Sequence, residues 1–416
     1  MRILVVSLIV LLCRFSDSLG QADRLTLTPA QAVAWALEHN PKVIAAKKAW
    51  DAVRARIWPA RMLPDPQMIF EYEELPGALR LSRSGNRFIG FGQTLEFPTK
   101  PYLRGRMADR EAQTARMDYE SARIEVVAEV TRACGRVWSS ERIQKYTAEN
   151  LKLAEEFRDK TKVRVEAGDV SSVEALRAEV EAGRAEAGVA EADNRVTLAR
   201  AALNALLSRD LSAPLEVAGD LSYMPLEIDL QTLRQMAIDR RPDLQGAKAT
   251  LEGAKAERAL TTSALLPDLS FQVFRQSVRG EGNFWKAGFG FTVPLWAFGR
   301  QRGEIAGAGA SIARAEAERA GAKNRALLEV EEAYLNVRTS ERRVLLYRDR
   351  VLPGAEETYR VVRRRYDEGK SNYLEVIDAG RTLAETRVAS VEALLDYHAA
   401  VADLTKAVGG KLEIAK

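Results

Sequence analysis

Residues 326–346 read ALLEVEEAYLNVRTSERRVLL. This stretch contains neither glycine nor proline and consists mostly of residue types that favour helix. It belongs to a longer run, residues 302–366, in which Pro353 is the one proline. At about 1.5 Å per residue, a helix of that length is a rod of roughly 100 Å. A compact globular domain cannot hold such a rod, so we expect an extended helical fold, bent at Pro353.

The chain repeats its motifs, in the same order, at an offset of about 200 residues, which indicates an internal duplication. We therefore predict a first repeat at 23–210 and a second at 211–416. The paired motifs are His39-Asn40-Pro41 with Arg240-Arg241-Pro242, Leu63-Pro64-Asp65 with Leu266-Pro267-Asp268, Gly90-Phe91-Gly92 with Gly288-Phe289-Gly290, Ser139-Ser140-Glu141-Arg142 with Thr339-Ser340-Glu341-Arg342, and Glu166-Ala167-Gly168 with Asp367-Glu368-Gly369.

Each repeat has one predicted layout: a helix, two strands, a very long helix, a tight turn and a shorter closing helix. Gly168 and Gly369 mark the turns, because glycine accepts the positive φ that reverses the chain. The predicted first-repeat elements are helix 29–57, strands 66–73 and 87–97, long helix 101–165 and closing helix 172–208. Their counterparts are helix 230–263, strands 268–276 and 284–293, long helix 302–366 and closing helix 372–408.

The strand segments alternate between apolar and small or polar residues. Phe289 and Phe291 share one face, and Gly288 and Gly290 the other. Such alternation is typical of membrane-spanning strands, although a half-buried sheet in a soluble domain alternates in the same way. Four strands cannot close a barrel, and lipid does not tolerate an open strand edge. If the strands span a membrane, several chains must share one barrel, with Phe289 and Phe291 facing lipid.

The N-terminus has the layout of a secretory signal peptide at 1–22. Arg2 precedes an apolar run at 3–12, and small residues follow at Ser18, Gly20 and Ala22. We expect the mature chain to begin between residues 19 and 24. Cys13 follows Leu12, where a lipoprotein site requires a small residue, so we expect no lipid on Cys13.

Composition argues against several classes of function. Positive and negative charges are interspersed and nearly cancel at +4, which is unlike a nucleic-acid-binding protein. Two histidines and two cysteines cannot form a structural zinc cluster. We find no nucleophile elbow, metal-ligand pair or phosphate-binding loop, so we expect no enzyme, no cofactor and no metal site. A coiled-coil scaffold without a pore is the rival from another class, and the strands and export signal argue against it.

Three local motifs carry a resemblance to a known family. They are GKSNYLEVID at 369–378, its first-repeat counterpart GDVSSVE at 168–174, and GQTLEFPTK at 92–100. With the duplicated layout, they make the chain resemble the TolC-family outer-membrane factors over nearly all of its mature length.

That resemblance implies a mainly α fold with a small β part. Three identical chains would each give four strands to one twelve-stranded barrel in the outer membrane, and their helical hairpins would form a tunnel across the periplasm. The implied partners are a periplasmic adaptor protein and an inner-membrane pump of the RND type. The implied function is passive, gated export through a tripartite efflux pump.

The resemblance also implies a constriction at the inner end of the tunnel. Its carboxylates would be Glu375 and Asp378, just after the second turn, with Tyr366 before that turn and Glu174 after the first. A run of arginines, Arg363 to Arg365, would supply opposing charge. Solvated helix-end charges are the plainer interpretation of these residues.

The cargo is less constrained. The LPDP motif at 63–66 and the EFPTK motif at 96–100 resemble factors that serve heavy-metal cation pumps, in which the second motif usually reads Pro-Phe-Pro-Gly-Lys. Glu96 and Thr99 depart from that pattern. Heavy-metal cations are thus one expected cargo, and drug efflux and type I polypeptide secretion are the alternatives.

Overall fold

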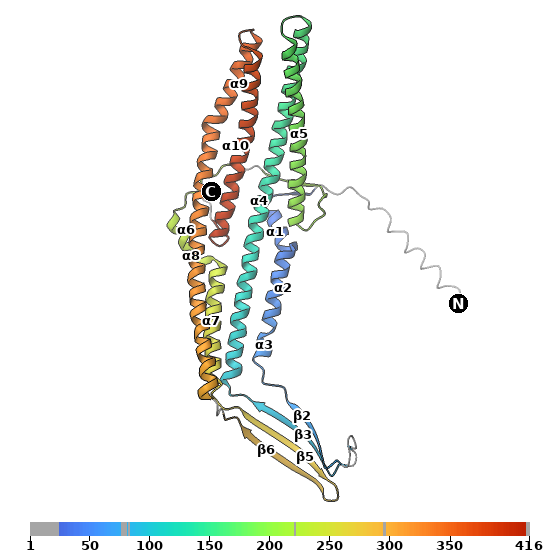
Figure 1. Cartoon of the computed structure of the whole chain (residues 1–416), viewed down its shortest axis with the longest axis vertical. Coiled ribbons are helices and arrows are strands. Elements are labelled where there is room, and N and C mark those ends of the chain that lie inside the picture. The colour runs from blue at the N-terminus through green and yellow to red at the C-terminus, as the bar shows by residue number, and fades with distance from the viewer. Residues whose placement is uncertain (1–24, 76–80, 82–83, 220–221, 294–296, 413–416) are drawn as a thin grey trace, which may run out of the picture.

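A computed structural model describes residues 25–75, 81, 84–219, 222–293 and 297–412. The predicted signal peptide and Cys13 lie outside these residues. Within them the chain is a bundle of long helices with a four-stranded sheet at one end and two helical hairpin tips at the other (Figure 1). The predicted mainly α fold with a small β part is confirmed.

The elements of the two repeats follow one another in the same order. The first repeat contains β1 (Leu25–Leu27), α1 (Pro29–His39), α2 (Pro41–Ala55), α3 (Ile57–Ala60), β2 (Gln67–Glu73), β3 (Asn86–Leu95), α4 (Thr99–Glu166) and α5 (Ser172–Leu206). The second contains β4 (Leu215–Val217), α6 (Leu230–Arg240), α7 (Pro242–Ser263), β5 (Leu269–Val278), β6 (Gly282–Phe291), η2 (Ala297–Gln301), α8 (Arg302–Leu346), η3 (Tyr347–Val351), α9 (Leu352–Asp367) and α10 (Tyr373–Ala407).

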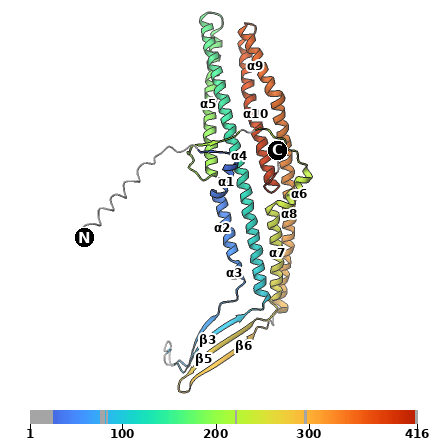
Figure 2. The same cartoon turned by 180° about the vertical axis from the view of Figure 1, so that it is seen from behind.

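Two continuous rods span the helical part of the molecule (Figures 1 and 2). The first is α4, a single helix of 68 residues. The second runs through α8, η3 and α9, and its irregular turn η3 lies just before Pro353 rather than at the proline itself. The N–H of Leu352 bonds to the carbonyl of Tyr347, so a π-helical turn absorbs the disturbance that proline imposes on the helix.

The prediction of one helix at 29–57 and one at 230–263 is wrong, because each is broken at a proline. Asn40 is extended, with φ −70° and ψ 126°, and Arg241 is extended, with φ −64° and ψ 123°. A residue before proline avoids the helical region, so the helix ends there and a new one starts. Asn40 donates to the carbonyl of Leu206 at 2.9 Å, and Arg241 donates to that of Ala407 at 3.2 Å. Both breaks thereby hold the end of the closing helix of their own repeat.

Each repeat has its own hydrophobic core near the middle of the rods. Val130, Val137 and Leu203 are fully buried in the first core, and Val330, Val337 and Leu404 occupy the equivalent places in the second. Beside the first core, β1 pairs in parallel with β4, so a segment before the first helix joins the start of the second repeat.

The other sheet combines strands of both repeats in the order β2-β3-β5-β6. Its central pair, β3 and β5, is antiparallel, with Phe91 opposite Val273 and Leu95 opposite Leu269. Where this pair meets the helices, Lys100 lies 2.6 Å from Asp268, which also accepts the backbone N–H of Phe97 at 2.9 Å. This contact fixes the start of α4 to the strand of the other repeat.

Among the described residues, none of the helices combines the length and the apolar character needed to cross a membrane.

Candidate functional site at the helix tips

The two helical hairpins end in turns of the same construction. Gly168 has φ +81° and Gly369 has φ +71°, both in the left-handed region that glycine tolerates. After the first glycine, the N–H of Asp169 bonds to the carbonyl of Arg164 at 2.9 Å. After the second, the N–H of Lys370 bonds to the carbonyl of Arg365 at 2.8 Å. Both are Schellman caps, so the duplication preserves the turn geometry as the sequence predicted.

Each returning helix is capped on its first turn. The Ser171 hydroxyl accepts the N–H of Val173 at 3.2 Å, and the Asn372 side chain accepts the N–H of Glu375 at 3.0 Å. Glu174 and Glu375 follow these caps, where the partial positive charge of a helix N-terminus favours a carboxylate. The caps therefore place one acid from each repeat at the tip of the molecule.

An aromatic cluster packs the two hairpins together just behind the turns. Phe157 of α4 contacts Tyr366 of α9 and Tyr373 of α10, with ring centroids 5.2 Å apart in each case. Arg164 lies over the ring of Tyr366 at 5.1 Å. Ala178 of α5 completes the contact, so all four tip helices meet here.

The hydroxyls of Tyr366 and Tyr373 are buried and have no hydrogen-bond partner within the described part of the chain. Burial raises the pKa of Tyr373 well above its usual value. The charges of Glu181 and Glu174 and the neighbouring Tyr366 raise it further, and Arg177 opposes them. The cluster therefore keeps Tyr373 as the neutral phenol to a higher pH than an ordinary tyrosine.

Ion pairs join the same hairpins outside the aromatic cluster. Arg381 of α10 lies 3.0 Å from Glu181 of α5, and Arg387 of α10 lies 3.4 Å from Glu149 of α4. All four side chains are partly exposed, so each pair contributes roughly 0–1 kcal/mol. The buried rings make the larger contribution to holding the tips together.

Glu375 and Asp378 are exposed, on the side of α10 opposite Tyr373 and Val376, which are buried. Glu375 accepts the hydroxyl of Ser371. No ion pair to Asp378 is found within the described residues. The two acids are thus close together and available to solvent or to another copy of the chain.

The other two predicted site residues are also near the tips but are less exposed. Tyr366 is buried in the aromatic cluster, and Glu174 is half-buried beside it. The predicted pairing of Glu375 and Asp378 with the arginine run does not occur within the chain. Arg363 instead lies 4.0 Å from Glu156, and Arg365 donates to the carbonyl of Lys370 at 3.5 Å. Arg363 and Arg365 make these other contacts instead, so closeness in the sequence did not predict their partners.

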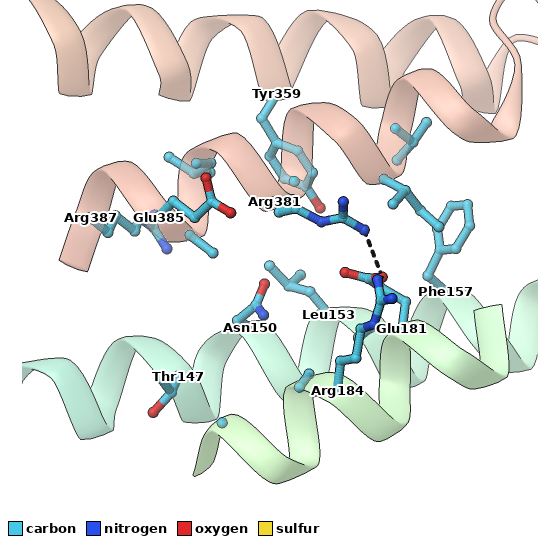
Figure 3. Close-up of a pocket in the computed structure, with 18 of the residues that line it drawn as sticks. Thr147, Asn150, Leu153, Phe157, Glu181, Arg184, Tyr359, Arg381, Glu385 and Arg387 are labelled. Carbon is cyan, nitrogen blue, oxygen red and sulfur yellow. Dashed lines mark hydrogen bonds and ion pairs between the residues drawn. The ribbon is translucent and has the colours of Figure 1, made fainter. Parts of the chain in front are cut away.

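A cavity of about 340 Å³ lies between the two hairpins, on the side of the aromatic cluster away from the turns, and Phe157 and Tyr373 of the cluster line it. Figure 3 shows Arg381 and Glu181 facing each other across it, with Tyr359 contributed by α9 and Leu153 by α4. Its wall is largely apolar, and ion pairs join Arg184 and Arg381 to Glu181 and Arg387 to Glu149.

Phe157, Tyr373 and the Arg381–Glu181 pair are functional residues that were not predicted from the sequence. The burial of Tyr373 could have been predicted, because it precedes Val376 by three residues and thus begins the apolar stripe of its helix. The contacts of Phe157 could not have been predicted, since nothing in the sequence places it beside residues over two hundred positions later.

At the opposite end of the molecule, Phe289 and Phe291 are 81% and 69% exposed on β6. The register places Phe289 opposite Phe271 and Phe291 opposite Leu269, on one face of the sheet. The same face continues through Phe91 and Met68. Four neighbouring strands thus present one mostly apolar face, which also carries Arg275 and Gln93.

Throughout the described ranges, no group of three or more His, Cys, Asp or Glu side chains is arranged to hold a metal ion.

Comparison with known proteins agrees with this geometry. The family model described as "Outer membrane efflux protein" matches residues 33–209 and 233–410. The cobalt-zinc-cadmium resistance protein CzcC of Cupriavidus metallidurans is 26% identical over 383 residues, covering 92% of this chain and 90% of that protein. Among solved structures, the CmeC outer membrane channel of Campylobacter jejuni gives a TM-score of 0.78 at 17% identity, covering 93% of this chain and 87% of that one. The open state of the MtrE outer membrane channel of Neisseria gonorrhoeae gives 0.78 at 20% identity, covering 92% and 89%.

Proposed function

Because the chain belongs to the outer membrane efflux protein family, we propose that it is the passive exit channel of a tripartite efflux pump. In this proposal three copies combine their sheets into one barrel in the outer membrane. Their helices form a tunnel through the periplasm, whose tips meet an adaptor protein and an inner-membrane pump. No catalytic step is required, because the pump supplies the energy and the channel supplies the route.

The observation that carries the proposal is the division of the molecule into two ends. One end is a sheet with an apolar face and two open edges. The other is a pair of capped hairpin tips with exposed acids, joined to the sheet by a helix of 68 residues. At about 1.5 Å per residue, that helix reaches roughly 100 Å, far beyond the thickness of a bilayer.

We propose that Glu375 and Asp378 line the narrowest part of the tunnel. Three copies around one axis would form two stacked rings of carboxylates. Like charges held close together favour bound cations, so such rings select cations and attract multivalent ions as blockers. Tyr366 and Glu174 would act indirectly, by fixing the two hairpins on which the tip depends.

The cargo we propose is a divalent heavy-metal cation. The support is the likeness, over 92% of this chain, to a protein named for cobalt, zinc and cadmium resistance. An efflux channel for organic solutes is the second candidate, since a toluene efflux pump outer membrane protein of Pseudomonas putida is 26% identical over 311 residues. Zinc and toluene tolerance of a host that lacks the gene, with and without the restored chain, would separate the two.

Single-channel recording in a planar bilayer tests the conduit itself. The purified chain should conduct with cation preference, and trivalent ions should block from the side of the helix tips. The double variant Glu375→Gln with Asp378→Asn should conduct more, select cations less and lose the block. Glu392→Gln, on the same helix but further from the tip, controls for loss of charge. Unchanged selectivity and block in the double variant would place the constriction elsewhere.

A further inference from the structure

The cavity between the two hairpins lies where small side chains face one another. Those that line it come from three helices and are Ala154, Ala185, Gly188, Gly380 and Ala384. The aromatic cluster closes one end of the cavity through Phe157 and Tyr373. Close-packed proteins leave few spaces larger than a water molecule, and a volume of about 340 Å³ is within the range of pockets that hold small organic molecules.

One polar group in the wall of this cavity lacks a partner. Tyr373 is 3% exposed, and its hydroxyl makes no hydrogen bond to any described residue. Buried hydroxyls are nearly always hydrogen-bonded, because an unpaired one loses its hydration without compensation. A phenol hydroxyl donates one hydrogen bond, so an acceptor at this end of the cavity would satisfy it.

The charges at the same end are unevenly matched. Arg184 and Arg381 both donate to one atom, Oε2 of Glu181, at 3.4 and 3.0 Å, and Figure 3 shows the two arginines around that carboxylate. After burial itself, Glu181 is the group with the largest effect on the pKa of Tyr373, so these charges act at the tyrosine end. A guanidinium carries five N–H donors, which leaves both arginines donors for a further acceptor. The whole lining contains three arginines and two glutamates, so it favours an anion.

We propose that the cavity binds a small aromatic carboxylic acid in its ionised form. The carboxylate accepts hydrogen bonds from Arg381, Arg184 and the hydroxyl of Tyr373, and such charge-assisted bonds are the stronger kind. The aromatic ring lies between Leu153 of α4 and Tyr359 of α9, which Figure 3 shows on opposite walls. Contact between two aromatic rings adds to the gain from burying apolar surface.

Such a ligand joins the two hairpins. Arg184 belongs to α5, whereas Arg381 and Tyr373 belong to α10, so one carboxylate bridges them. Separation of the hairpins removes one wall of the site, and the ligand therefore binds the packed arrangement more tightly and shifts the balance toward it. At ten times its dissociation constant, it favours the packed arrangement up to about elevenfold. One chain builds the whole site, so the inference does not depend on the proposed barrel or cargo.

Two glycines of α5 provide a matched test of the site. Gly188 lines the cavity, whereas Gly183 is exposed on the same helix and is not part of the lining. At both positions the described residues place nothing within 4 Å of an added Cβ. Gly188→Leu therefore fills the cavity and Gly183→Leu does not, while both variants make the same change in helix propensity.

Naphthoate is the probe, and isothermal titration calorimetry of the purified chain in detergent measures its binding. It should bind wild type and Gly183→Leu with equal affinity, and Gly188→Leu about tenfold or more weakly. Partition of the probe into detergent is the same for all three proteins. Equal affinity for the two leucine variants, or no saturable binding to wild type, would overturn the site.

The charge of the ligand is tested separately. Naphthamide, which is neutral, and naphthylmethylammonium, which is a cation, should bind wild type more weakly than naphthoate. Arg381→Gln and Tyr373→Phe should each lower the ratio of naphthoate affinity to naphthamide affinity by about tenfold. Arg360→Gln, which changes an exposed arginine outside the lining, should leave that ratio unchanged. Tighter binding of the cation, or an unchanged ratio in Arg381→Gln, would show that the ligand is not a carboxylate.

The distance between spin labels on the two turns, at Asp169 and Lys370, tests the coupling to the tips. Naphthoate should reduce the population at long distance in wild type and in Gly183→Leu, but not in Gly188→Leu. Saturable binding to wild type without this reduction would contradict the bridging of the two hairpins.

Discussion

Phe157→Ala should loosen the helix tips more than the loss of any single ion pair between the hairpins. Phe157 is half-buried and makes two ring contacts, to Tyr366 and Tyr373, each at 5.2 Å. Each such pair is worth about 0.5–1.5 kcal/mol beyond area burial, and complete loss of a buried phenylalanine costs about 3–5 kcal/mol. For this half-buried side chain we expect about 2 kcal/mol, which shifts the balance between packed and separated hairpins about 30-fold.

Arg381→Gln provides the comparison. The Arg381–Glu181 pair is 45% and 25% exposed, so its removal should cost about 0.5 kcal/mol and shift the same balance about twofold. Phe157→Leu should fall between the two variants, because it keeps apolar volume but loses the ring contacts.

Spin labels at Asp169 and Lys370, one on each turn, report the separation of the hairpins. Both positions are exposed. Distances are measured by electron–electron double resonance in assemblies diluted with unlabelled chain. The population at long distance should increase in the order wild type, Arg381→Gln, Phe157→Leu, Phe157→Ala. A larger change in Arg381→Gln than in Phe157→Ala would refute the conclusion that ring packing dominates.

Three further predictions concern single residues. The pKa of Tyr373 is raised in the folded state, so the neutral phenol stabilises the packed tips fully below the ordinary tyrosine pKa of 10.0, and this stabilisation is lost as the pH rises above that value. Separation of the tips should therefore increase above about pH 10, and Tyr373→Phe should remove this pH dependence. Gly90→Ala should lower the melting temperature of the assembly, because the added Cβ would lie 2.2 Å from the ring of Phe274, whereas at Gly288 the described residues place nothing within 4 Å of an added Cβ, so Gly288→Ala should perturb it less. Phe289→Arg should destabilise the folded oligomer by about 2–4 kcal/mol if that face meets the middle of a bilayer, and so lower the yield of heat-resistant oligomer. Unchanged heat resistance would contradict the lipid-facing assignment.

The long helices were predictable because their signal is local. Residues 101–165 were expected to form a helix and Thr99–Glu166 does so, since a run of helix-favouring residues ends only where the glycine turn begins. The strands were predictable for a related reason, because alternation with period two is visible within ten residues. The breaks at Pro41 and Pro242 were missed although the proline itself was the signal.

The rest depends on contacts between distant segments. β1 and β4 are three residues long, too short to show a pattern, and they exist because they pair with each other. The aromatic cluster combines Phe157 with two tyrosines of the other hairpin, which no local pattern can indicate. Family resemblance drew attention to the acids at the tip, Glu375 and Asp378. Only the structure shows that they are exposed and that they do not contact the arginine run.

The order of the strands in the sheet also bears on how the protein folds. Each helical hairpin joins neighbours in sequence, so α4 and α5 can pack as soon as both have been made. The sheet cannot form so early, because Leu95 of β3 pairs with Leu269 of β5, which is synthesised later. Pairings between such distant positions form slowly, whereas local helical contacts form quickly. The helical hairpins should therefore be complete while β3 still lacks β5 beside it, with apolar side chains of β3 exposed to aggregation. Hydrogen exchange during refolding should therefore show hairpin amides protected before those of the pair formed by β3 and β5.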